Sequence, residues 1–320
     1  MAGLFNSVPQ WASRHHYYHH SNPAMPDSVT FLEKYIFRPL LQKAWDTIRS
    51  TASDGDKAAA WKTINMHKID NANMMSGRLV QDHCDRVILG DQPISESVSK
   101  MFADLHEWEP PANHPAVEKQ LAIRTHREAV RYTDEGRRPT KKGATADATE
   151  MELVASNALA GLREALKQVN HLYGEDDLEG TLGSCALSYL GKPDYAGHVE
   201  LKTKWDTRAH TDSPNARSLP KKVEHNHLMQ VAGYYALSGL QPTVVYATRS
   251  GHAIHRPSSE ELKVAVDDIV EACLRRERLL QQAETAYDLV RLTDPVWEHP
   301  YAYADFNKER YAAAREIWRG

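Results

Sequence analysis

The chain has 320 residues, 41% hydrophobic and 26% charged, which is the composition of an ordinary globular protein. No apolar run approaches the roughly 18–20 residues that cross a bilayer, so the sequence excludes an integral membrane protein and predicts no membrane partner. The formal net charge of -4 gives no overall attraction to nucleic acid, so nucleic-acid binding would need a local basic surface.

The N-terminal half is predicted to form a flexible arm followed by helices. Residues 1–27 are rich in His, Tyr, Ser, Asn and Pro without a hydrophobic period, which predicts an exposed, flexible arm. Apolar residues at three- and four-residue spacing predict a helix over 28–50, and further helices are predicted over 74–89 and 116–132. The segment 136–150 is basic at first and rich in Gly, Pro, Thr and Ala, which predicts an exposed loop.

The middle of the chain changes from helical periodicity to strand-like periodicity and back. A helical pattern covers 151–169, and residues 172–205 then alternate with a period of two between punctuating glycines, which predicts a hairpin-rich segment. A second helix is predicted over 221–238, ended by Gly239, and the β-branched run at 242–248 predicts a strand.

The C-terminal part is predicted to be helical. Arg249 and His252 are expected on a glycine-containing loop after the strand. Ser258, with Glu261 three residues later, forms a capping box that predicts the start of a long helix reaching about Leu292. The whole pattern divides the chain into a flexible arm (1–27), a helical region (28–150), a core (151–255) and C-terminal helices (256–320), the last of them over 306–318.

Cysteine usage predicts a reducing compartment. Cys84, Cys185 and Cys273 are odd in number and far apart, which argues against a disulfide framework and against a clustered zinc or iron–sulfur site.

The segment GKPDYAGHVELKTKW (191–205) carries the candidate chemistry. From His198 to Trp205 the residues alternate between two faces, so Glu200 and Lys202 point to the same side, one pleat apart. Asp194 precedes a turn predicted at Tyr195-Ala196-Gly197, and a hairpin would bring it opposite Glu200, with Cβ atoms about 4.5–5.5 Å apart.

Two carboxylates at that separation repel one another unless a cation lies between them. Oxygen ligands of this kind suit Mg²⁺, for which Mn²⁺ can substitute, and the Leu201 carbonyl is a natural additional ligand. A metal ion there would polarise a phosphate and lower the pKa of a bound water. Lys202 would orient that water or stabilise charge in the transition state. The alternative is a solvated strand edge.

A second motif lies on the predicted helix downstream. His227, Gln230 and Tyr234 are spaced by three and four residues, so they share one stripe with Val223 and Leu237. Polar side chains on an inward stripe need partners when buried, and a metal site with bound phosphate would supply them. The alternative is a helix with an ordinary polar edge.

The motifs GKPD, VELKTKW and HLMQVAGYYAL, with its Q-x-x-x-Y, together resemble those of the PD-(D/E)xK nucleases. Within this superfamily the chain is similar to the RecB-like and phage-type (lambda exonuclease-like) branch over residues 175–250, and more weakly over 75–90. The resemblance implies an α/β fold: a restriction-endonuclease-like core with a mixed central β-sheet flanked by helices, plus N- and C-terminal helical additions.

The resemblance also implies roles for individual residues. Asp194 and Glu200 correspond to the metal carboxylates and Lys202 to the catalytic lysine. Gln230 and Tyr234 correspond to the helix pair that supports the site and meets DNA. Glu179 resembles the acidic residue that opens the first strand.

An earlier helix of the family often supplies another metal ligand after a glycine. The comparable stretch is SGRLVQDHCD, in which Gln81 stands where the family's His would fall if Gly77 is the anchor. Asp82 or His83 can take the ligand's place, so all three residues stay candidates, and Asp82 is the predicted metal ligand.

Basic and aromatic residues near these motifs are candidate DNA contacts. Lys204, Trp205 and Arg208 extend the strand and could track a backbone or stack on a base. Lys221 and Lys222 are expected at the start of the second-motif helix, whose dipole also favours phosphate. Solvated surface charges are the alternative for each.

The implied function is Mg²⁺-dependent hydrolysis of DNA by an exonuclease acting on linear duplex or single strands. The alternatives are a structure-specific or restriction-type endonuclease and a catalytically silent DNA-binding recombination partner. The resemblance allows a homo-oligomer and a single-strand annealing or replication protein as partner. The expected location is the cytoplasm of a bacterial or phage-infected cell, with a mitochondrial location left open.

Overall fold

The computed structural model shows a mixed α/β protein with a small, mixed three-stranded sheet between helices. It describes residues 18–19, 25–67, 72–90, 92–106, 148–167, 182–183, 189–196, 198–205, 217–297 and 308–319. The predictions that fall outside the described residues concern the arm up to residue 24 apart from 18–19, the helix over 116–132, most of the loop over 136–150, Glu179, Cys185, Gly197 and Arg208.

The central sheet has the strand order β4-β5-β6. β4 (Val199–Thr203) runs parallel to β5 (Thr243–Thr248), and β5 pairs antiparallel with β6 (Gly251–His255). β4 therefore lies at one edge of this sheet. A separate short sheet has the order β1-β3-β2 and contains β1 (Tyr18–His19), β2 (Leu182–Gly183) and β3 (Tyr189–Gly191).

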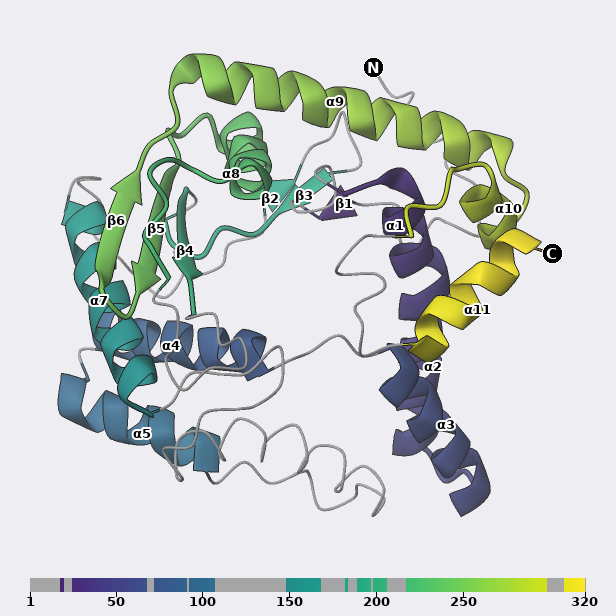
Figure 1. Ribbon diagram of the computed structural model, residues 1–320, viewed down its shortest axis with the longest axis horizontal. Coiled ribbons are helices and arrows are strands. Elements are labelled where there is room, and N and C mark those ends of the chain that lie inside the picture. The colour runs from purple at the N-terminus through teal and green to yellow at the C-terminus, as the bar shows by residue number, and fades with distance from the viewer. Residues whose placement is uncertain are drawn as a thin grey trace.

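Helices cover both faces of the central sheet (Figure 1). Helix α7 (Ala148–Lys167) packs on one face, with α4 (Ala72–Ile88) beside it and α5 (Ile94–His106) beyond. On that side Val245 and Ala247 of β5 enter the core formed with α4 and α7. The alternate residues of β5, Val244 and Tyr246, pack against α8, which therefore covers the opposite face.

Helix α8 spans His225–Ser238 and ends at Gly239, whose φ of 71° is left-handed, as the sequence predicts. Close packing of the other face depends on a second glycine. A Cβ on Gly161 would lie 2.7 Å from the Val245 side chain, so glycine lets α7 approach β5 closely.

A second core lies at the other end of the molecule, where α9 extends past the sheet to α10 (Figure 1). One continuous helix there comprises α1 (Asp27–Phe31), the π-helical turn η3 (Leu32–Phe37) and α2 (Arg38–Arg49). The remaining elements are α3 (Asp54–His67), α9 (Ser259–Gln282), α10 (Ala286–Arg291) and α11 (Lys308–Arg319). Within the described residues, every helix is too short or too polar to serve as a transmembrane span.

Several predicted boundaries are wrong, each for a physical reason. Residues 148–150 belong to α7 rather than to a loop, because Glu150 is buried. His252 lies in β6, not in a loop, because its segment pairs with β5. Helix α9 ends at Gln282, short of Leu292, since Thr285 caps the new helix α10 by accepting a hydrogen bond from the Asp288 N–H.

Helix α8 also begins later than predicted, at His225 instead of Lys221. Glu224 stays extended before it, because its N–H donates to the Tyr246 hydroxyl and its carboxylate binds Lys204. Helices α3 and α5 and the π-helical turn are further elements that the sequence patterns do not predict.

Candidate functional site

The candidate site lies between the polar face of β4 and helix α8. Its centre is Glu200, which is 2% exposed and accepts hydrogen bonds from two elements. Lys202 Nζ, on the same strand, and Gln230 Nε2, on α8, each donate to Oε1 at 2.5 Å. The Tyr234 hydroxyl lies 3.0 Å from Oε2. The alternation of β4 and the three- to four-residue spacing of α8 thus bring these four side chains together.

A carboxylate in such a buried place costs several kcal/mol of desolvation unless donors replace its water. Lys202 supplies a formal positive charge, and Gln230 and Tyr234 supply neutral donors. Burial, and then the nearby Glu200 carboxylate, raise the pKa of Tyr234 far above its ordinary value, so the phenol keeps its proton. The Tyr234 hydroxyl also accepts from Gln230 at 2.7 Å and lies 3.0 Å from the Lys192 carbonyl.

Asp194 reaches the free edge of β4 through a tight turn. Tyr195 and Val199 form an antiparallel bridge, whose register places Asp194 across from Glu200. Ala196 completes the turn with a φ of 52°, in the left-handed region that non-glycine residues rarely adopt. The Asp194 carboxylate accepts a hydrogen bond from the Leu201 N–H at 2.8 Å, which locks the turn to the strand.

The Leu201 carbonyl lies on the same free edge. Along β4 and its extension, the backbone N–H and C=O groups of the even-numbered residues face β5. The Thr243 N–H donates to the His198 carbonyl, and the Lys204 N–H donates to the Ala247 carbonyl. The N–H and C=O of one strand residue point to the same side, so the Leu201 carbonyl points outward with the N–H that binds Asp194. A backbone carbonyl oxygen that can serve as a metal ligand therefore lies beside the two carboxylates.

Of the three candidates on α4, the structure brings Gln81 to the site. Its Nε2 donates to Asp194 Oδ1 at 3.3 Å. His83 is fully buried and its Nδ1 lies 2.9 Å from Ser97 Oγ of α5, so the ring faces away from β4. Asp82 is exposed. Helix α4 lies close to β4 because Gly77 has no side chain: a Cβ there would be 3.1 Å from Thr203 Oγ1.

The chemistry of the donor set fits Mg²⁺. Asp194, Glu200 and the Leu201 carbonyl offer hard oxygen atoms. Glu200 Oε1 already accepts from Lys202 and Gln230, whereas Oε2 accepts from Tyr234 and keeps a lone pair for a cation. Across the described residues, no three His, Cys, Asp or Glu side chains gather as metal ligands, so Asp82 does not complete a cluster with the other two acids. Mg²⁺ commonly uses only one or two protein carboxylates and fills its remaining positions with water and substrate phosphate.

The predicted DNA contacts have different surroundings. Lys204 Nζ binds Glu224 at 2.6 Å and lies over the Tyr246 ring, 5.8 Å from its centroid. Trp205 is partly buried against the core beneath α4 and α7, so its ring also serves packing. Lys221 and Lys222 are exposed but precede α8, which removes the helix-start argument for them.

The structure adds contacts that the sequence patterns do not single out. Tyr246 lies in an apolar strand run, where periodicity indicates only core packing, yet its hydroxyl bonds both Glu224 and His227. Glu224 carries no motif, and its role depends on Lys204, twenty residues earlier. Tyr195 donates to Asp85 at 2.5 Å and thereby ties the turn to α4.

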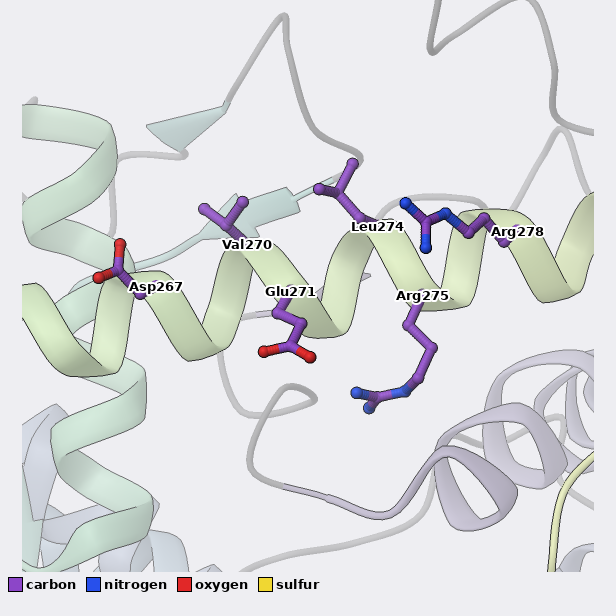
Figure 2. Close-up of a pocket in the computed structure, with 6 residues that line it drawn as sticks. All are labelled: Asp267, Val270, Glu271, Leu274, Arg275 and Arg278. Atoms are coloured by element: carbon purple, nitrogen blue, oxygen red, sulfur yellow. The ribbon is translucent and has the colours of Figure 1, made fainter.

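A hollow on α9 offers no comparable set of groups. Figure 2 shows the side chains that line it, all from this one helix: Asp267, Val270, Glu271, Leu274, Arg275 and Arg278. Arg275 is engaged by Asp27 of α1 at 2.6 and 3.1 Å, and the two acids of the hollow precede its two arginines along the helix. The chemistry of the described residues is therefore concentrated at β4 and α8.

Comparison with known proteins assigns no relative. No family model matches the chain, and it matches neither a curated protein nor a solved structure.

Proposed function

We propose that this protein is a Mg²⁺-dependent deoxyribonuclease of the PD-(D/E)xK type, with a restriction-endonuclease-like core around β4, β5, α7 and α8. The observation that carries the proposal is the placement of Asp194 across from Glu200 at the edge of β4, with Lys202 bound to Glu200. A structural ion pair would need only Glu200 and Lys202. The second carboxylate and the outward Leu201 carbonyl are what a divalent cation requires.

Each residue of the candidate site has a defined task in this proposal. Asp194, Glu200 and the Leu201 carbonyl hold the cation, while Gln230 and Tyr234 fix the Glu200 carboxylate through its two oxygens. Mg²⁺, when bound, supplies charge neutralisation at the phosphate and favours ionisation of the attacking water. Lys202, 23% exposed, orients that water or stabilises charge on the phosphorane-like transition state.

Exonucleolytic action on linear DNA is the specific form of the proposal, and it rests on the likeness of the motifs. The endonuclease alternative uses the same residues. Digestion of linear and covalently closed circular DNA separates the two, because an exonuclease leaves the circle intact. A homo-oligomer, an annealing or replication protein as partner, and a bacterial, phage-infected or mitochondrial setting belong to this proposal as well.

The test is digestion of end-labelled linear duplex and single-stranded DNA with Mg²⁺, Mn²⁺, Ca²⁺ or EDTA. We expect degradation with Mg²⁺ or Mn²⁺ and none with EDTA. Lys202→Ala should lower the rate by at least about 100-fold, because it removes the charge at the reacting phosphate. Lys263→Ala, at an exposed position on α9, is the matched control and should cut like the wild type. Equal cutting by Lys202→Ala would exclude the assigned site.

A further inference from the structure

His227 lies on the same stripe of α8 as the residues that hold Glu200, but no contact with Glu200 explains its position. It precedes Gln230 by one turn and is 9% exposed. Its Nδ1 lies 2.8 Å from the hydroxyl of Tyr246 on β5. Tyr246 is in turn the β5 partner of Lys202 in the strand register, so the ring is next to the lysine end of the site.

The contacts of Tyr246 determine the tautomer of His227. The Tyr246 hydroxyl accepts a hydrogen bond from the Glu224 N–H at 3.0 Å. Its own proton needs an acceptor, since the phenol is fully buried, and within the described part of the chain the other partner of this hydroxyl is His227 Nδ1. Nδ1 is therefore the acceptor, and in a neutral ring the proton resides on Nε2.

The surroundings also determine the charge of the ring. Burial, and then the cations Lys202 and Lys204, lower the pKa of His227 from 6.5 to about 3. The 3.5 Å approach of His227 Nδ1 to Glu224 is therefore no ion pair at neutral pH, although the geometry alone would allow one. His227 presents a neutral N–H donor on a ring that feels the charges of Lys202 and Lys204, a combination that suits an anionic oxygen.

We propose that the Nε2–H of His227 donates a hydrogen bond to a non-bridging phosphate oxygen of the bound DNA strand, beside Lys202 and Lys204. This inference rests on the proposed function and adds one substrate contact to it. Tyr246 acts as a positioning residue, because it orients the ring through Nδ1 without meeting the phosphate. Glu224 competes with the phosphate for Lys204.

The experiment measures binding of a fluorescein-labelled duplex oligonucleotide in EDTA, where cutting is absent, over a series of salt concentrations. His227→Met keeps bulk without the donor, and His227→Gln keeps a terminal N–H₂ donor. We expect about tenfold weaker binding for His227→Met, equivalent to about 1.4 kcal/mol, and binding near wild type for His227→Gln. A neutral donor releases no counterion, so the salt slope should stay unchanged, whereas Lys204→Ala should lower it by about 0.9.

Each outcome separates this inference from the proposed function. If the wild-type protein binds no DNA in EDTA and none with Ca²⁺ in its place, the nuclease proposal fails and this contact fails with it. If the wild type binds DNA but His227→Met binds equally well, or lowers the salt slope, only the His227 contact is overturned. Imidazole ¹⁵N NMR of the wild type is the second measurement: we expect a protonated Nε2 and a bare Nδ1 between about pH 5 and pH 8, and the opposite tautomer would overturn the inference without any variant.

Discussion

Asp194 and Glu200 lie opposite each other in register but have different surroundings, and this difference assigns them different tasks. Glu200 is buried among three donors, so its orientation is fixed before any ligand arrives. Asp194 is only partly buried, and its two oxygens accept from Leu201 and Gln81. The Asp194 carboxylate is therefore the more exposed of the two predicted cation ligands, and substituting it is the better test of the cation site.

Replacing Asp194 with asparagine should weaken Mg²⁺ binding by at least about tenfold, because a neutral amide oxygen substitutes for a charged ligand while still accepting the Leu201 N–H. Isothermal titration calorimetry with Mg²⁺ measures the effect. Asp267→Asn, at an exposed position on α9, is the matched control. An unchanged affinity in Asp194→Asn would remove this residue from the cation site.

The starts of α8 and α9 show two ways in which a helix can begin. Helix α9 is capped locally: Ser258 Oγ accepts from the Glu261 N–H at 3.2 Å, and Glu261 Oε2 accepts from the Ser258 N–H at 2.8 Å. Helix α8 has Glu224 at its N-cap without a side-chain cap bond, because that carboxylate binds Lys204 on the strand extension instead. The first start follows from neighbouring residues, and the second follows from tertiary contacts.

Ser258→Ala should lower the free energy of unfolding by about 1 kcal/mol, since it removes the side-chain acceptor for the first turn of α9. Ser259→Ala is the matched control, because Ser259 is exposed and is the first helical residue rather than the cap. Urea unfolding followed by circular dichroism compares the two variants. Equal midpoints for Ser258→Ala and Ser259→Ala would contradict the role of the capping box.

Across the whole molecule, α9 connects the core around α8 with the helices of the opposite end (Figure 1). At that opposite end, α9 contributes two charged residues to the protein interior. Arg276 and Glu277 are almost fully buried, opposite Lys34 of the π-helical turn. Burial, and then Arg276 and Arg38, lower the pKa of Lys34 from 10.5 to about 6, while Glu277 and Cys273 oppose the shift. This interface therefore makes stability depend on pH.

The sign follows from proton binding. Between about pH 6 and 10.5 the unfolded chain holds the Lys34 proton and the folded protein does not, so the free energy of unfolding rises with pH. Lys34→Met should lower that slope by up to about 1.4 kcal/mol per pH unit. Urea unfolding at about pH 7, 8 and 9 measures the slopes, with the exposed Lys43→Met on α2 as control. Equal slopes of unfolding free energy against pH for the wild type and Lys34→Met would refute the lowered pKa of Lys34.

Much of the fold and of the candidate site could be predicted where the rule is local. Alternation placed Glu200 and Lys202 on one face of a strand, helical spacing placed Gln230 and Tyr234 on one stripe, and the left-handed Gly239 ended α8. The edge strand β6 was not predicted, because its five residues are all intermediate in burial and carry no clear alternation. The pairing with β5 is what makes that segment a strand.

Residue order alone specifies which side chains share a face, because backbone periodicity and capping depend on residues a few positions apart. The docking of α4 beside β4 is what selects Gln81, and neither Asp82 nor His83, as the hydrogen-bond partner of Asp194, since Gln81 and Asp194 are 113 positions apart in the chain. Tertiary contact also fixes the tautomer of His227 on helix α8, through Tyr246 on strand β5. Such contacts depend on how helices dock against the sheet, and no local pattern encodes that distance.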